Sequence, residues 1–255
     1  HVYEIRDSTL VEPLTHEPVV WNVQDQYKSW INPTADWYLD PSRWAVPFAS
    51  TGHGIAATAR FEPTDIAALI NTHHHGDHTG GNGVFRPKTK TIIGHVNVPK
   101  YMKSTYDIAI AQRAKQDPPP TTPAPGEPVV PDKTFADTFA FDHGDERISM
   151  KHYGPAHTGG DIVIRFEKAN VAHMGDLMFN KLHPVIDRVN GASIANWTVA
   201  LQTVAKEMPA DTIYIFGHAG PGQEVTGGRA DLLHHGDYLV ALLDFVRAHA
   251  PAAAG

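Results

Sequence analysis

The sequence lacks cysteine altogether, which excludes disulfide bonds and metal sites built on thiolates. It also lacks any run of about 20 apolar residues, the length that a transmembrane helix requires. Basic residues are fewer than acidic ones, 21 against 28, so the formal net charge is −7. Because nucleic-acid binding requires a basic surface, we expect neither nucleic acid nor a membrane as a partner.

These absences leave the cellular compartment open. The chain begins at His1 rather than at methionine, which a cleaved signal peptide and a trimmed tag explain equally well. We expect a soluble protein, either periplasmic or secreted, or cytoplasmic. The sequence does not indicate an oligomeric state.

The length of 255 residues suits a single domain over residues 1–255. Two stretches stand apart within it: an atypical N-terminal segment, residues 1–60, and a proline-rich loop, residues 117–131. Candidate ligands lie on both sides of the loop, so we interpret it as an exposed connection within the domain. Apolar runs predict strands at 2–6, 19–23, 66–70, 91–95, 139–141, 148–150, 161–166, 170–174 and 212–216, and helical patterns appear at 98–115, 193–208 and 229–248.

Histidine is abundant, with 17 residues, and its clustering predicts a metal site. The segment His73-x-His75-x-Asp77-His78 directly follows a predicted strand. In an extended backbone, residues i and i+2 point the same way, so His73 and His75 can bind one ion together. The chain then turns, and Asp77 with His78 can face a second ion. Imidazole and carboxylate groups are the ligands that suit zinc where no thiolate is available.

Three later residues extend this pattern. His157, Asp176 and His218 each lie in a glycine-containing loop that follows a strand-like run. Each would be unremarkable alone, because a single histidine is more often a core or surface residue and a single aspartate often belongs to a turn. Their recurrence in this order behind the histidine-rich segment makes them candidate ligands.

Several neighbours receive supporting or neutral roles. His74 should point away from the ions, and Thr72 should pack or form hydrogen bonds. Thr158 and Asp161 are candidates to orient His157 or its neighbours, since metal-bound imidazoles donate their second N–H to an oxygen. His234 and His235, in the last predicted helix, are interpreted as surface residues, and His1 as a remnant of processing.

The histidine-rich segment with its later His, Asp and His resembles the metallo-β-lactamase superfamily over roughly residues 64–249. The resemblance implies an α+β fold, a four-layer αββα sandwich with metal-binding loops along one edge of two sheets. It implies two zinc ions and a catalytic role for Asp77. The implied ligands are His73, His75 and His157 for the first ion, Asp77, His78 and His218 for the second, and Asp176 as a bridge between both.

The resemblance also implies a mechanism. Paired zinc ions lower the pKa of a shared water from about 15.7 to near 7, and the metal-bound hydroxide attacks a polarised carbonyl. We therefore expect a dinuclear zinc hydrolase that opens a small ester, lactone or amide bond, β-lactams included. An acidic chain disfavours the nucleases of the family, which need a basic surface.

Two departures from the family pattern limit the substrate assignment. Many true β-lactamases have cysteine or serine at the position of Asp176, and a lysine shortly afterwards binds the β-lactam carboxylate, whereas Lys181 comes late. Residues 1–60 also fit the family poorly. The alternatives are a thioesterase of the hydroxyacylglutathione hydrolase type, which a basic patch would support, and a di-iron oxidoreductase. Relatives of the latter carry a flavodoxin-like domain or a glutamate ligand, and neither is found in this sequence.

Overall fold

The computed structural model describes residues 66–118, 120–121 and 124–249, together with three short strands nearer the N-terminus. These strands, β1 (Ile5–Arg6), β2 (Thr9–Val11) and β3 (Pro18–Val19), pair antiparallel in that order. They belong to the smaller of two compact units, and residues 51–54, 64–120 and 124–255 form the larger one. The rest of the N-terminal segment, including His1, lies outside the described residues, so the expected single domain stays a prediction.

The larger unit begins with a small parallel sheet. Its strands are β4 (Leu69–Ile70), β5 (Ile92–His95) and β6 (Lys133–Phe135), in the order β4-β5-β6. Strand β5 is buried along its whole length, which agrees with the apolar pair Ile92 and Ile93 at its start. The described residues of the proline-rich loop form neither helix nor strand, as predicted.

A larger sheet of six strands follows in the order β14-β12-β10-β9-β8-β7. Its strands are β7 (Thr138–His143), β8 (Glu146–Lys151), β9 (Val163–Phe166), β10 (Val171–His173), β12 (Ile213–Ile215) and β14 (Thr226–Gly227). All neighbours pair antiparallel except β10 and β12, which are parallel and are connected through a helix. Strands β11 (Phe179–Asn180) and β13 (His218–Ala219) form a separate parallel pair.

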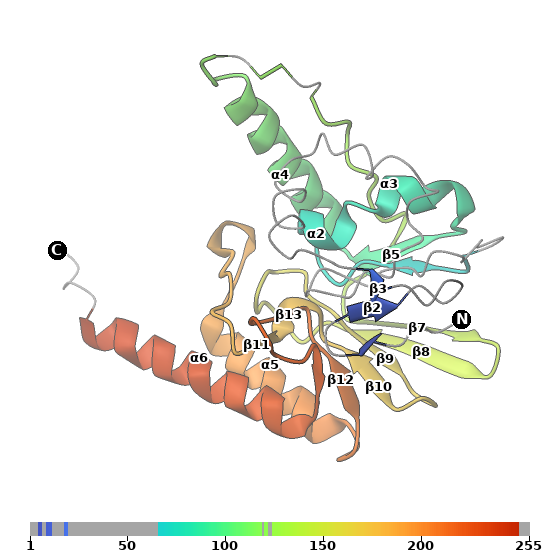
Figure 1. Ribbon diagram of the computed structural model, residues 1–255, viewed down its shortest axis with the longest axis vertical. Coiled ribbons are helices and arrows are strands. Elements are labelled where there is room, and N and C mark those ends of the chain that lie inside the picture. The colour runs from blue at the N-terminus through green and yellow to red at the C-terminus, as the bar shows by residue number, and fades with distance from the viewer. Residues whose placement is uncertain are drawn as a thin grey trace. The chain divides into compact units, whose positions relative to one another are not determined.

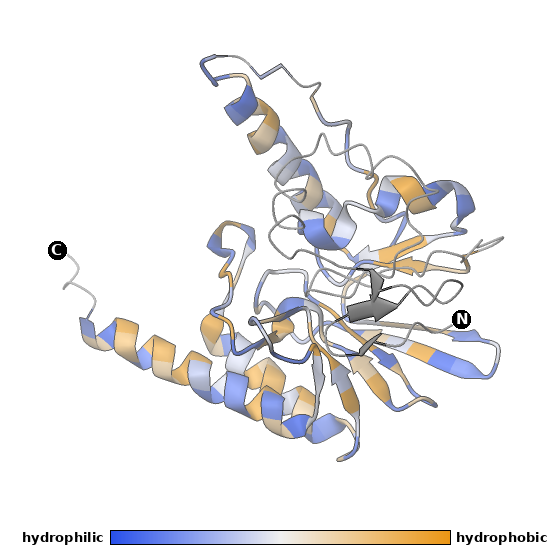
Figure 2. Cartoon of the chain, viewed as in Figure 1, coloured by the Kyte–Doolittle hydropathy of each residue, from blue (hydrophilic) through white to orange (hydrophobic). Residues whose placement is uncertain are grey.

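The two main sheets pack face to face through an apolar core. Ile93 of β5 contacts a cluster that includes Ile148 and Met150 of β8 and Ile164 of β9. In Figure 2 the apolar colour gathers along β5 and the inner part of the six-stranded sheet, while the β7–β8 turn is hydrophilic. Burying one face of each sheet supplies the main driving force for this arrangement.

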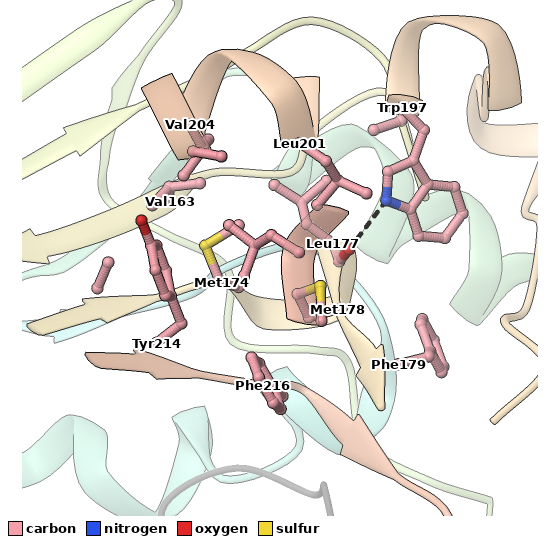
Figure 3. Close-up of a cluster of buried hydrophobic side chains, with 14 of the residues drawn as sticks. Val163, Met174, Leu177, Met178, Phe179, Trp197, Leu201, Val204, Tyr214 and Phe216 are labelled. Carbon is pink, nitrogen blue, oxygen red and sulfur yellow. Dashed lines mark hydrogen bonds between the residues drawn. The ribbon is translucent and has the colours of Figure 1, made fainter. Parts of the chain in front are cut away.

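Helices cover the outer face of each sheet (Figure 1). Helix α4 (Val98–Arg113) packs on the small sheet through the buried Val98 and Met102. Helices α5 (Ile194–Glu207) and α6 (Arg229–His249) cover the large sheet, where a second core joins Trp197 and Leu201 to the strand residues Ala172 and Tyr214 (Figure 3). The larger unit is therefore the expected α+β fold, an αββα sandwich.

The ends of the long helices follow their sequence signals with one exception. Ser193 caps α5, because its hydroxyl accepts a hydrogen bond from the backbone N–H of Asn196 (3.3 Å), and the helix ends before Pro209. In α6, a helical pattern would place Leu232, Leu239 and Val246 on one apolar face, but only Leu232 and Leu239 are buried, and Val246 is 50% exposed. The last turns of α6 extend past the end of α5, so α5 does not cover that face (Figure 1). Among the described residues, no helix has the length and apolar character needed to cross a membrane.

Candidate metal centre

The histidine-rich segment leaves the small sheet at the end of β4 and bends into helix α2 (Gly76–Thr79). Two amide side chains brace this bend. Asn71 and Asn82 exchange hydrogen bonds, with Asn71 Nδ2 donating to Asn82 Oδ1 (2.9 Å) and Asn82 Nδ2 donating to Asn71 Oδ1 (2.8 Å). Asn82 begins the short helix α3 (Asn82–Phe85), which leads into the 3₁₀ turn η3 (Arg86–Lys88). The pair therefore ties the strand end to the residues beyond the segment.

The later candidate ligands come from three other connections of the larger unit. His157 lies in the loop between β8 and β9, Asp176 in the 3₁₀ turn η4 (Gly175–Leu177) after β10, and His218 at the start of β13. His157 and Asp176 are buried, and His218 is partly buried. The fold thus brings together residues that are more than 140 positions apart in the sequence.

One group of side chains contains His73, His75, His157 and Asp176, whose candidate ligand atoms all lie within 4.8 Å of one another. Nε2 of His157 is 3.0 Å from Nδ1 of His75 and 3.5 Å from Oδ2 of Asp176. Nε2 of His73 is 3.8 Å from the same oxygen. These residues are the ones assigned to the first ion, together with the proposed bridge.

A second group contains Asp77, His78, Asp176 and His218. Nε2 of His218 is 2.9 Å from Oδ2 of Asp176, and Nε2 of His78 is 3.0 Å from Oδ1. Asp77 Oδ2 is 3.3 Å from His78 Nε2 and 3.4 Å from His218 Nε2. Asp176 is the only member common to both groups, the position that a bridging ligand requires.

The donors of both groups fit zinc ions. All of them are imidazole nitrogens or carboxylate oxygens, and Nε2 of His73 is buried without a hydrogen-bond partner. A buried polar atom left unpaired in this way costs free energy unless something else binds it. The structure brings all seven candidate ligands together, while metal binding by them stays a prediction.

The charges of the site depend on Asp176. Burial alone would raise the pKa of this carboxyl, but the neighbouring His73 and His78 outweigh burial and hold the pKa well below its ordinary value. Conversely, burial would lower the pKa of His78, but the carboxylates of Asp176 and Asp77 raise it to about 10, and they raise that of His218 to about 9. The two carboxylates and the two imidazoles of the second group therefore attract one another electrostatically.

The support for His157 differs from the one predicted. Its Nδ1 donates to the backbone oxygen of Val185 (2.8 Å), so the partner of the imidazole is a carbonyl and not Thr158 or Asp161. Asp161 instead accepts hydrogen bonds from the backbone N–H and the hydroxyl of Thr158, both at 2.7 Å. These two residues shape the loop that carries His157. Thr72, as predicted, forms hydrogen bonds, with its hydroxyl 3.2 Å from Nδ1 of His73.

Sequence reasoning missed Asp187. Its Oδ2 lies 3.0 Å from Nε2 of His75 and 3.3 Å from Nε2 of His74, and the three side chains form a third compact cluster. His74 takes part in neither of the other groups, which agrees with the prediction that it points away. The rule that a ligand imidazole needs an oxygen partner predicts an oxygen beside His75, but it does not identify Asp187 as the residue that supplies it.

The interpretation of His235 as a surface residue was wrong, whereas His234 is exposed. His235 is 6% exposed and stacks between Tyr238 and Phe179, because it lies on the face of α6 that packs against the core. It lines a pocket of about 310 Å³ that also contains Lys181 and His183. The ring of Phe179, which lines this pocket, stacks on His218 at 4.8 Å.

Burial of His235 predicts a loss of stability in acid. Burial lowers its pKa from 6.5 to about 4. Between these values the unfolded chain binds a proton that the folded chain does not, so the free energy of unfolding falls as the pH drops, by about 2 kcal/mol at pH 5. Urea unfolding at pH 7 and pH 5 should give a smaller difference for His235→Phe than for the wild type. His234→Phe, at the exposed neighbour, should keep the wild-type difference, and equal behaviour of both variants would contradict the assignment.

On one side, the Asp176 carboxylate packs against backbone atoms and not against a side chain. A Cβ atom added at Gly217 would overlap Oδ1 of Asp176 and lie 2.6 Å from the carbonyl oxygen of Gly175. We expect Gly217→Ala to displace the carboxylate and lower activity about a hundredfold, the effect of a misplacement near 1 Å. Gly228→Ala is the matched control, since nothing lies within 4 Å of its added Cβ. The activity and the zinc content of both variants should be measured. Unchanged values for Gly217→Ala would show that the backbone shifts enough to accommodate the added methyl group.

This chain is similar to several known proteins. A model of the metallo-beta-lactamase superfamily matches residues 42–248, which is most of the chain. The crystal structure of the BLEG-1 B3 metallo-beta-lactamase is similar with a TM-score of 0.51 and 19% identity, covering 69% of this chain and 78% of that one. A metallo-beta-lactamase from Pontibacter korlensis gives a TM-score of 0.47 and 19% identity, covering 68% and 69%. No curated protein matches this chain.

Proposed function

This chain belongs to the metallo-β-lactamase superfamily, and from that premise we propose that it is a hydrolase that uses two zinc ions to open a small ester, lactone or amide bond. Most members of the superfamily are hydrolases. The observation that carries the proposal is the sharing of Asp176 between two groups of ligand side chains.

The seven candidate ligands would be shared between the two ions. His73, His75 and His157 would hold one ion, Asp77, His78 and His218 the other, and Asp176 both. When bound, the two ions would lower the pKa of a water molecule and polarise the carbonyl of the substrate.

Asp77 is the residue proposed to act on the attacking water. Its side chain is 21% exposed, more than that of Asp176 at 3%, so solvent reaches it. A carboxylate in this position can accept a hydrogen bond from the water and orient it toward the substrate. The buried Asp176 would instead keep its negative charge to hold the cations.

The choice of substrate class rests on charge and on the pocket beside β11. An acidic chain makes nucleic acid an unfavourable substrate, so we propose a small molecule. Lys181 and His183 in the pocket are groups that bind a carboxylate, which supports thioesters or esters with an acidic part as a second candidate class.

Two measurements test the proposal together. Elemental analysis should find two zinc ions per chain, whereas two irons would favour the oxidoreductase alternative. A panel of chromogenic lactone, ester, thioester, β-lactam and phosphodiester substrates, the first three in neutral and acidic pairs, should reveal turnover that a chelator abolishes and zinc restores. A chain that binds zinc but hydrolyses none of them, or that hydrolyses only phosphodiesters, would contradict the proposed class.

A further inference from the structure

The orientation of His75 requires an explanation, because this side chain presents different nitrogens to two neighbours. Its Nδ1 lies 3.0 Å from Nε2 of His157, and its Nε2 lies 3.0 Å from Oδ2 of Asp187. A neutral imidazole carries one proton, and the partner of one nitrogen decides what the other can do. The question is therefore which nitrogen of His75 keeps the proton.

We propose that Asp187 is a positioning residue for the first ion: its carboxylate accepts the Nε2–H of His75 and leaves Nδ1 unprotonated, directed at the metal group. The inference rests on the proposed function, since it concerns a ligand of the proposed first ion. Ligand imidazoles in metalloproteins are commonly oriented in this way by an oxygen on their far side.

Asp187 is itself firmly held. It caps the 3₁₀ turn η5 (Arg188–Asn190), where Oδ1 accepts from the backbone N–H of Asn190 (3.1 Å) and Oδ2 from its side-chain amide (2.7 Å). Both oxygens of the Asp187 side chain therefore face hydrogen-bond donors, the amide groups of Asn190 and Nε2 of His75. A charged carboxylate can only accept, which places the proton on His75 Nε2.

The same turn fixes a second ligand. The backbone oxygen of Val185 accepts from His157 Nδ1 at 2.8 Å, and the backbone N–H of Asp187 donates to the oxygen of His157 at 3.3 Å. A carbonyl can only accept, so His157 must carry its proton on Nδ1 and present Nε2 as a lone pair. Residues 185–190 thus leave His75 Nδ1 and His157 Nε2 both unprotonated and facing one another, an arrangement that a cation between them stabilises.

Removing the carboxylate would permit another arrangement. Without Asp187, His75 can move its proton to Nδ1 and donate to His157 Nε2, which already lies within hydrogen-bond distance. That hydrogen bond would occupy both lone pairs that the ion needs. The proposed role of Asp187 is to prevent this hydrogen bond between His75 and His157.

His74 offers a competing reading, in which Asp187, His74 and His75 bind a third cation. Oδ2 of Asp187 already accepts hydrogen bonds from Asn190 and His75. An ion there, together with the first ion, would require His75 to carry no proton on either nitrogen. The orienting role needs no such species, and we favour it for that reason.

The experiment compares Asp187→Ala and Asp187→Asn with the control Ser193→Ala, which removes the cap of α5 without touching His75. Asp187→Asn preserves the shape of the side chain and so protects against a loss of fold. Two quantities are measured: the tautomer of His75 by long-range ¹H–¹⁵N NMR of the zinc-free protein, and zinc binding by titration. The tautomer is a readout that a purely structural role would not change.

We expect His75 to carry its proton on Nε2 in the wild type and in Ser193→Ala, and to shift toward Nδ1–H in Asp187→Ala. The affinity for one of the two zinc ions should fall about 10- to 100-fold in the Asp187 variants, the usual effect of losing an outer-shell partner. Unchanged tautomer and affinity, or the loss of a third zinc equivalent, would overturn the inference. Failure of the wild type to bind zinc would instead contradict the proposed function, and the tautomer would still decide the role of Asp187.

Discussion

Asp176→Ala should release both zinc ions and lower hydrolysis roughly a thousandfold, a loss that corresponds to about 4 kcal/mol in the activation barrier. The reason is its shared position: Oδ2 lies near His73, His157 and His218, and Oδ1 lies near His78. Removing this carboxylate also takes away one of the two counter-charges of His78 and His218 and leaves them only Asp77. Breaking a buried ion pair from one side costs about 3–5 kcal/mol of stability.

Because of that second effect, the experiment must separate lost binding from lost folding. Asp176→Asn keeps the size of the side chain and should bind zinc weakly while remaining folded by circular dichroism. Asp142→Ala is the control, since Asp142 is exposed and only pairs with Arg147 at 3.0 Å, an interaction of about 0–1 kcal/mol. Two tightly bound ions in folded Asp176→Ala would show that the bridge lies elsewhere.

Trp197→Ala should lower the free energy of unfolding by about 3–5 kcal/mol, because it leaves a cavity in the core that packs against the site. Trp197 is fully buried, and its indole N–H donates to the backbone oxygen of Leu177 at 3.0 Å (Figure 3). Leu177 follows Asp176 in η4, and the ring also contacts His157 at 5.6 Å between centroids. The Trp197 side chain thus packs against two candidate ligands, His157 directly and Asp176 through its neighbour Leu177.

Urea unfolding with a chelator present measures this effect without a contribution from bound ions. Trp197→Phe keeps an aromatic ring and should lose less than Trp197→Ala. Val199→Ala, on the exposed side of the same helix, should stay within about 0.5 kcal/mol of the wild type. A loss below 1 kcal/mol for Trp197→Ala would mean that the core collapses around the gap.

The sequence predicted those parts of the structure whose signals are local. Helix α5 has a capping serine at one end and a proline at the other, and β5 is a short apolar run, so both could be predicted from neighbouring residues. The histidine-rich segment was informative for the same reason, since its successive candidate ligands lie only one or two positions apart.

Features set by distant contacts could not be predicted in this way. Asp187 is 112 positions from His75, and nothing in its own neighbourhood marks it as a partner. His235 and Val246 lie in the same helix, α6, yet His235 is buried and Val246 is exposed. The difference arises because α5 packs against the part of α6 that contains His235 and ends before it reaches Val246 (Figure 1). A helical pattern gives the direction of a side chain, whereas its burial depends on the length of the neighbouring element.

The reciprocal amide bonds between Asn71 and Asn82 have a consequence for how the centre assembles. Both groups are uncharged, so their attraction is insensitive to acidity and to salt across the physiological range. The strand end and the helix that flank the metal-binding residues therefore keep their spacing whether or not cations are present. In a zinc finger the metal organises the polypeptide, whereas these amide bonds would hold the elements that flank the candidate site before any ion binds.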